Sequence, residues 1–375
     1  MSVAWKTLPF EQALMDVSAG NVKLQTDEYL PHGNFPIVDQ GKALVAGYSD
    51  DPSALARVEA PIIVFGDHTR VFKYVDFPFC IGADGVRLLR PIDGIDTRYA
   101  FQFLNAAAIP SAGYSRHFKF LKRIEVSFPP LDEQRRIAAI LDQADELRRA
   151  RRKALQLITS YAWANFVEIF GDPISNQMGW DHQRVLDTLE LPLRNGVSPS
   201  STGTVARMVL TLSAVTGAEF DNTWVKEGVF AGTPPAEKLV SSSDFLVCRG
   251  NGNLNLVGRG FFANGDNAEI VFPDTMIAAR FSPKLLEPIF VETLWNSSFV
   301  RSQIEPMART TNGTFKINQT ALEGIRLLTP PLDLQRAFAA RVTEIDALKA
   351  HHRAHLARLD ALFSALQHRA FRGEL

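Results

Sequence analysis

The sequence of 375 residues predicts an α+β protein: two mixed α/β domains joined by two long helices that form an antiparallel coiled coil, with pseudo-twofold symmetry. The first observation is a repeat. The segment PPLDEQR at 129–135 returns 201 residues later as PPLDLQR at 330–336. Aligned without a gap, 129–170 and 330–371 share 14 of 42 residues. Self-similarity at a long period indicates duplicated structural units.

The second observation is an apolar stripe at spacings of three and four residues, which is typical of one helix face. Its members are Ile137, Leu141, Ala144, Leu147, Leu155, Ile158 and Ala162, and the aligned Phe338, Val342, Ile345, Leu348, Leu356, Leu359 and Phe363. Arg151 and His352 interrupt both stripes at one shared position. Neither helix can bury its stripe alone, so we expect the two to pair. Two core helices of one compact domain would explain the stripe but not its recurrence.

The boundaries follow from the helix signals. Each double proline marks a helix start, because proline is tolerated in the first turn, and Gly171 and Gly373 supply the stops. The predicted domains are therefore 1–128 and 171–329, with helical spacers at 129–170 and 330–375. A helix of about 40 residues is roughly 60 Å long.

Within the two domains, buried strands are predicted at 61–65 and 244–248, and helices at about 98–107 and 288–304. No run of about 18 apolar residues and no leader-like start is found, which predicts a cytoplasmic protein. Cys80 and Cys248 have no metal-like spacing and predict neither a disulfide framework nor a zinc site. The formal net charge of −1 is unusual for a nucleic-acid binder, so such a role requires local basic patches or partners.

Three polar segments are candidate nucleic-acid contacts. Two lie near the ends of the domains, at 114–123 and 309–316, and the third at 249–255 combines glycines with asparagines. Arginine grips guanine or phosphate bidentately, asparagine suits adenine and threonine serves either. The alternative for any one of these residues is a solvated surface position. The candidates are Arg116, His117, Lys119, Lys122, Arg249, Asn251, Arg309, Thr311, Asn312 and Lys316.

Several catalytic signatures are missing from the sequence. It has no phosphate-binding loop with Lys-Ser/Thr, no Asn/Asp-Pro-Pro-aromatic site for amino-methylation and no Gly-x-Ser-x-Gly elbow. His351 and His355 stand four residues apart, but no third metal ligand is placed near them. We therefore predict no catalytic residue, metal site or cofactor in this chain.

Three motifs carry a family resemblance: FPPLDEQRRI at 128–137, IFGDP at 169–173 and HRAFRGEL at 368–375. With these, the chain resembles the specificity (S) subunits of type I restriction-modification systems, and SRHFKFLK at 115–122 is similar to that family's approach to the first helix. The resemblance implies two target recognition domains, one for each half of a bipartite double-stranded DNA site.

The resemblance also implies partners. Two modification subunits would bring S-adenosylmethionine and methylate adenine after base flipping, and restriction subunits would add translocation and cleavage with ATP and Mg²⁺. Two other hypotheses are a catalytic DNA methyltransferase or nuclease, against which the missing methylation site argues, and a coiled-coil scaffold with ligand-binding heads that do not bind DNA.

Overall fold

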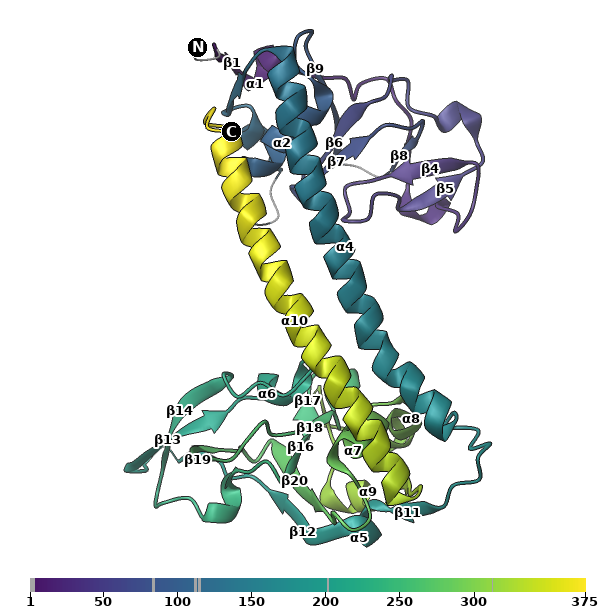
Figure 1. Ribbon diagram of the computed structural model, residues 1–375, viewed down its shortest axis with the longest axis vertical. Helices are drawn as coiled ribbons and strands as arrows, with labels where there is room; N and C mark the ends of the chain where they lie inside the picture. Colours follow the sequence, from purple (N-terminus) through teal and green to yellow (C-terminus); the bar gives the residue numbers. More distant parts are fainter. Residues whose placement is uncertain (1–3, 83–84, 111–112, 114–115, 201, 312) are drawn as a thin grey trace. The chain divides into compact units, whose positions relative to one another are not determined.

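The computed structural model describes residues 4–82, 85–110, 113, 116–200, 202–311 and 313–375 (Figure 1). It divides into two compact units. The first unit comprises Met1–Ala154 and His352–Leu375, and the second comprises Leu155–His351. Each unit therefore holds one domain and one half of each long helix. No helix within the described ranges is both long and apolar enough to cross a membrane.

The two predicted helices are α4 (Leu131–Phe170) and α10 (Leu332–Ala370). In each unit their halves pack antiparallel (Figure 1), which confirms the predicted fold class. In the first unit Arg148 Nε donates to Asp360 Oδ1 at 2.6 Å, and Arg151 Nη1 lies 3.0 Å from His352 Nδ1. The two residues that interrupt the stripes thus meet each other.

The stripe is not buried along its whole length. Ile137, Leu141 and Phe338 are buried, but Leu147 is 58% exposed and Leu348 is 47% exposed. The ends of the helices pack against a domain as well as against each other. Away from the ends, each helix is covered on one side only, by the other helix. The expectation that Leu147 and Leu348 lie in the seam was wrong.

The two domains share one strand order. In the first unit an antiparallel sheet runs β2-β9-β6-β7, and in the second the order β12-β20-β16-β18 repeats it. The predicted buried strands are confirmed as β6 and β16, within a residue at their starts. The bounds in this sheet are β2 Leu14–Asp16, β6 Ile62–Gly66, β7 Phe72–Val75 and β9 Val86–Pro91, and β12 Leu189–Asn195, β16 Phe245–Cys248, β18 Gly260–Phe262 and β20 Met276–Phe281.

Each domain adds a second four-stranded sheet with parallel pairing: β8 pairs in parallel with both β3 and β4 in the first unit, and β13 pairs in parallel with β19 in the second. A two-stranded ribbon leads into each long helix, β1 with β10 and β11 with β23. The bounds are β1 Lys6–Pro9, β3 Lys23–Leu24, β4 Phe35–Val38, β5 Gly47–Ser49, β8 Cys80–Gly82, β10 Glu125–Phe128, β11 His182–Arg184, β13 Val205–Leu210, β14 Val225–Phe230, β15 Leu239–Val240, β19 Asn267–Val271 and β23 Arg326–Leu328.

Short helices cover these sheets. The helix predicted near 98–107 is α2 (Thr97–Ala106), and the one predicted at 288–304 is two helices, α7 (Pro288–Trp295) and α8 (Ser298–Met307). The others are α1 Phe10–Ala13, α3 Phe118–Leu121, α5 Val185–Thr188, α6 Ser213–Thr216 and α9 Gln319–Glu323.

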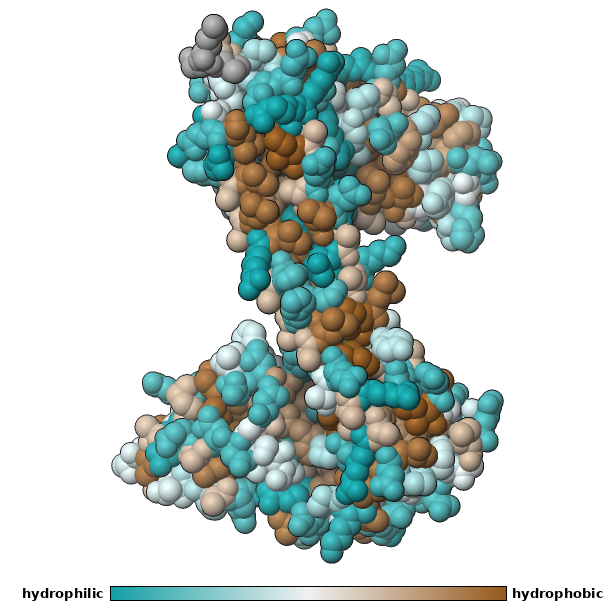
Figure 2. All heavy atoms as spheres, viewed as in Figure 1, coloured by the Kyte–Doolittle hydropathy of each residue, from teal (hydrophilic) through white to brown (hydrophobic). Residues whose placement is uncertain are grey.

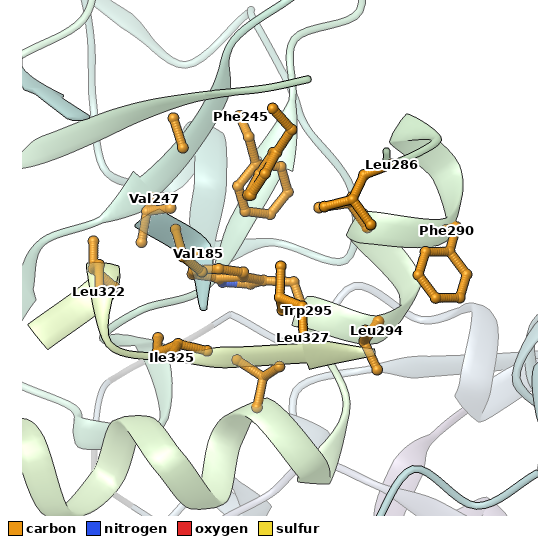
Figure 3. Packing of buried hydrophobic residues seen from close by; sticks show 14 of the residues in the cluster. Val185, Phe245, Val247, Leu286, Phe290, Leu294, Trp295, Leu322, Ile325 and Leu327 are labelled. Carbon is orange, nitrogen blue, oxygen red and sulfur yellow. The ribbon is translucent and has the colours of Figure 1, made fainter. Parts of the chain in front are cut away.

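An aromatic cluster joins the long helices to the domain of the second unit. Phe166 and Phe170 of α4 and Phe338 of α10 are fully buried, and their ring centroids lie 4.9–5.6 Å from each other or from Phe290 of α7. Behind it, Trp295 packs among the strand residues (Figure 3) and donates from Nε1 to Gly258 O at 2.7 Å. Large buried aromatic rings contribute strongly to a core, so the helix ends belong to the domain core.

A buried glutamine in each repeat ties the helix start to the domain. Gln134 accepts from Asp96 N at 2.8 Å and donates to Gly94 O and Pro129 O at 2.9 and 2.8 Å. Gln335 repeats all three bonds, with Glu287 N at 2.9 Å, Leu285 O at 3.0 Å and Pro330 O at 2.8 Å. Both glutamines are fully buried. We call this pair of arrangements the glutamine clamps.

We predict that Gln134→Ala lowers the free energy of unfolding by about 3 kcal/mol, because it leaves one buried N–H and two carbonyls without partners. Urea unfolding of the full chain measures this. Gln143→Ala on the exposed side of the same helix is the matched control and should change stability by less than about 0.5 kcal/mol. Equal midpoints for the two variants would contradict a structural role for the first clamp.

A second prediction concerns pH. Burial raises the pKa of the Glu292 carboxyl from 4.5 to about 7. The hydrogen bond that Phe262 N donates to Glu292 Oε2 at 3.0 Å lowers this pKa and offsets part of the rise. Between these values the folded chain binds more protons than the unfolded chain, so stability falls as pH rises from about 4.5 to about 7. The loss from this group is about 3 kcal/mol. Glu292→Gln should be more stable than wild type at pH 8 and lose this pH dependence, whereas Glu168→Gln, at an exposed site, should keep it.

Candidate nucleic-acid interface

The two candidate segments of the second unit come together in one small sheet. It has the order β17-β22-β21, with β17 at Gly250–Asn251, β21 at Arg309–Thr311 and β22 at Thr314–Lys316. Lys316 pairs with Gly250 on one side and with Arg309 on the other. The segments at 249–255 and 309–316 are therefore one surface. Within this sheet β21 and β22 form an antiparallel two-stranded ribbon, and such a ribbon is narrow enough to enter the major groove of DNA.

Three cations line a cavity of 570 Å³ beside this sheet. Arg249, Arg309 and Lys316 share its walls with Asn318 and Thr320, and no carboxylate is among its lining residues. Arg309 and Lys316 are exposed, whereas Arg249 is half-buried and donates from Nη1 to Asp274 O at 3.1 Å. The cavity thus concentrates positive charge on a chain whose net charge is −1. Such an arrangement attracts phosphate and the acceptor edge of guanine.

The remaining candidates of this unit are less defined. Asn251 uses its Oδ1 to accept from Asn253 N at 2.9 Å, which shapes the turn after β17. Thr311 ends β21 and pairs with Thr314 through the backbone. Asn312 lies outside the described residues, as do Tyr114 and Ser115 of the first-unit segment.

In the first unit the candidates surround α3. Arg116 and Lys119 are exposed, and the Lys119 ammonium lies 5.1 Å from the ring centre of Phe120. Lys122 is also exposed, but its Nζ lies 2.6 Å from Glu11 Oε1, so part of its charge is offset. Arg116 and Lys119 are therefore the stronger candidates for a phosphate contact.

His117 lies inside the unit and not on its surface. It is 1% exposed, its backbone N–H donates to Asp67 O and its Nδ1 is 2.9 Å from the same oxygen. Asp67 in turn accepts from Phe118 N through Oδ1 at 2.6 Å. These bonds fix the loop before α3 against the end of β6. The expectation that His117 contacts DNA does not fit this burial, and we assign it a structural role.

The internal repeat points to residues that the sequence did not single out. Asp67 N donates to Gly85 O and its carbonyl accepts from His117 N, while Arg249 N donates to Thr275 O and its carbonyl accepts from Ile317 N. Asp67 and Arg249 therefore occupy equivalent backbone positions with opposite charge.

It follows that the turn after Asp67 matches the loop after Arg249. This turn contains Arg70, which has a positive φ of 62° and donates to Ile109 O at 3.2 Å. The turn that follows the apolar strand, after β6 as after β16, is the sequence signal from which Arg70 could have been predicted as a candidate.

Comparison with known proteins identifies this architecture. Residues 14–158 match the family model of the type I restriction modification DNA specificity domain. The specificity subunit of the type I restriction enzyme StySPI from Salmonella potsdam is 30% identical over 141 residues. That match covers 36% of this chain and only 30% of the relative's length.

Two solved structures are similar over nearly the whole chain. The S subunit of a type I restriction-modification system from M. genitalium superposes with a TM-score of 0.60 at 15% identity, covering 98% of this chain and 96% of that one. A structure from work on complex assembly and conformational transition of the type I system gives a TM-score of 0.57 at 16% identity, covering 100% of both chains. At such identities these likenesses concern the fold. The chain is thus similar to these specificity subunits through a matched domain at residues 14–158 and through its fold over nearly the whole length.

Proposed function

We propose that this chain is the DNA-reading, non-catalytic subunit of a type I restriction-modification system. It would bind a bipartite double-stranded target and direct adenine methylation or restriction by partner subunits. The observation that carries the proposal is the convergence of Arg249, Arg309 and Lys316 on one cavity without a lining carboxylate. Phosphate contacts position a protein on DNA and base-edge contacts specify the sequence, and this set of side chains suits both.

The duplicated scaffold supports two independent readers. The sheet order recurs in both units, but the equivalent positions Asp67 and Arg249 differ in charge. Asp67 is 1% exposed and its Oδ1 accepts from Phe118 N, whereas Arg249 lines the cavity and can donate to guanine O6 and N7. The two units would therefore read different half-sites through the same framework.

The helices offer two related apolar grooves to partners, and exposed apolar side chains are visible along them in Figure 2. In the second unit a groove of 520 Å³ is lined by Leu157, Tyr161 and Leu348 among others. In the first unit a groove of 390 Å³ is lined by Leu147, Ala150 and Leu359 among others. Leu147 and Leu348 are aligned positions of the repeat. Exposed apolar patches mark protein contacts, and two related grooves suit two copies of one modification subunit.

S-adenosylmethionine, ATP and Mg²⁺ would then be bound by the partner subunits. In the part of the chain that the structure describes, no group of three His, Cys, Asp or Glu could hold a metal ion. The role of this chain is to choose the site, and adenine would be flipped and methylated in a partner's pocket.

The test is a pair of substitutions in the second unit. In the complex with the modification subunit of the same host, Arg309→Ala with Lys316→Ala should weaken DNA binding about tenfold or more at fixed salt, because one bidentate base contact contributes about 1–3 kcal/mol. Methylome sequencing should show relaxed recognition of one half-site only.

The matched control is Lys284→Ala with Arg326→Ala, which removes two exposed cations of the same unit outside the cavity. This control should leave both half-sites intact and weaken binding less. An equal loss in both double variants, or a change in both half-sites, would argue against a reader in this cavity.

A further prediction concerns the gap between the half-sites. Inserting four residues after Arg151 and four after His352 lengthens both helices at hydrogen-bonded positions by about 6 Å. The unread stretch of the target should grow by one or two base pairs, at about 3.4 Å per base pair, with both half-sequences unchanged. Four residues inserted after Gly20, an open turn position, serve as the control. An unchanged gap in a folded, active variant would refute the spacer role.

A further inference from the structure

A second cavity lies in the second unit, and none of the residues that the structure describes in the sheet β17-β22-β21 is among those that line it. It has a volume of 300 Å³ and is lined by Arg259, Arg301, Asn255, Asn296 and Ser298 among others. Two arginines therefore share a small cavity, to which the candidate segment 249–255 contributes Asn255. We call it the Arg259–Arg301 cavity.

The Arg301 guanidinium is only partly used by the protein. Its Nη1 donates to Val257 O at 2.6 Å, and its Nε lies 3.2 Å from Glu305 Oε1. The Nη2 atom is buried and has no hydrogen-bond partner within the described part of the chain. A buried donor without a partner costs about 1–3 kcal/mol, so a shift of the side chain that brings this N–H group to an acceptor in the cavity is favoured.

The two guanidinium groups also repel each other. Burial lowers the pKa of Arg301, Glu305 partly offsets this, and the charge of Arg259 lowers it further. Arg259 is held by a long contact of 3.4 Å from Nη1 to Thr216 O and lies 5.8 Å from the ring centre of Phe261. Like charges in one cavity are relieved by a bound anion.

The start of α8 faces the same cavity. Its N-cap Ser297 makes no capping bond, because its hydroxyl donates to Leu294 O at 2.6 Å. Ser298, the first residue of this ten-residue helix, is exposed and lines the cavity. Backbone N–H groups of a first helical turn have no partner within the helix and favour anions.

We propose that the Arg259–Arg301 cavity binds a phosphate group, and that in the complex this is a backbone phosphate of the DNA. This source rests on the proposed function. The loop from Arg249 to Arg259 and the helix α8 each run from one cavity to the other. From Arg301 to Met307 the helix rises about 9 Å, or roughly three nucleotides of one strand. The second cavity would hold the strand whose neighbouring bases are read at the first.

The first experiment uses the full chain and inorganic phosphate or pyrophosphate, without DNA. Calorimetry and thermal unfolding at constant ionic strength should detect binding, since a ligand that binds only the folded state raises its unfolding midpoint. Arg259→Gln should lower the affinity at least tenfold, and Arg326→Gln should not. No phosphate effect on the wild-type chain would overturn the proposal.

A second variant tests the cavity without the risk that a loss of phosphate binding merely reflects unfolding. Ser298→Asp adds a carboxylate at the start of α8, where negative charge stabilises the helix, yet it should abolish phosphate binding by repulsion. Undiminished phosphate binding in a folded Ser298→Asp chain would overturn the site.

The second experiment identifies the source of the phosphate. In the complex with the modification subunit, Arg259→Gln should reduce the slope of log affinity against log salt by about one, uniformly over DNA sequences. If phosphate binding falls but DNA affinity and slope do not change, a free phosphorylated ligand replaces DNA and the backbone assignment is refuted. If the wild-type complex binds no DNA, the proposed function fails while the phosphate measurement still decides the cavity.

Discussion

The glutamine clamps are the constraint on which the rest of the structure depends. A helix of 40 residues can hold a domain at a fixed angle only if its first turn is fixed to that domain. Gln134 and Gln335 do this with three hydrogen bonds each, at full burial. They also accept from the backbone of Asp96 and Glu287, the residues that cap α2 and α7. Buried networks that are fully satisfied are rigid, so the sheet, the covering helix and the long helix are coupled at one point.

Positive charge on this chain is a local property. The acidic and basic residues nearly cancel over the whole sequence, yet three cations meet at one cavity and two at another in the same unit. Several other cations are paired: Arg148 and Arg152 share Asp360, and Lys73 is buried with Asp39. Paired surface charges add little to long-range attraction. Association with a polyanion is therefore favoured at the two cavities, where cations gather and no carboxylate is among the lining residues.

Much of the fold could be predicted from the sequence because its signals are local. The double prolines, the repeated stripe and the apolar runs at β6 and β16 located the long helices and the central strands within a residue or two. The site could be predicted only as separate segments, because the pairing of Gly250 with Lys316 joins residues far apart in the chain. His117 and Leu147 were misplaced for a related reason. The burial of His117 depends on Asp67, and the exposure of Leu147 depends on how little a pair of helices can cover.

The clamps have an evolutionary consequence. Every partner of Gln134 and Gln335 is a main-chain group: an N–H at Asp96 or Glu287 and carbonyls at Gly94, Pro129, Leu285 and Pro330. The joint therefore recognises the path of the backbone and is indifferent to most side chains around it. A recombination event that replaces one domain with a foreign sequence of the same path would keep all three bonds. Under the proposed function, one half-site would then change in a single genetic step while the joint between the domain and the long helix is kept.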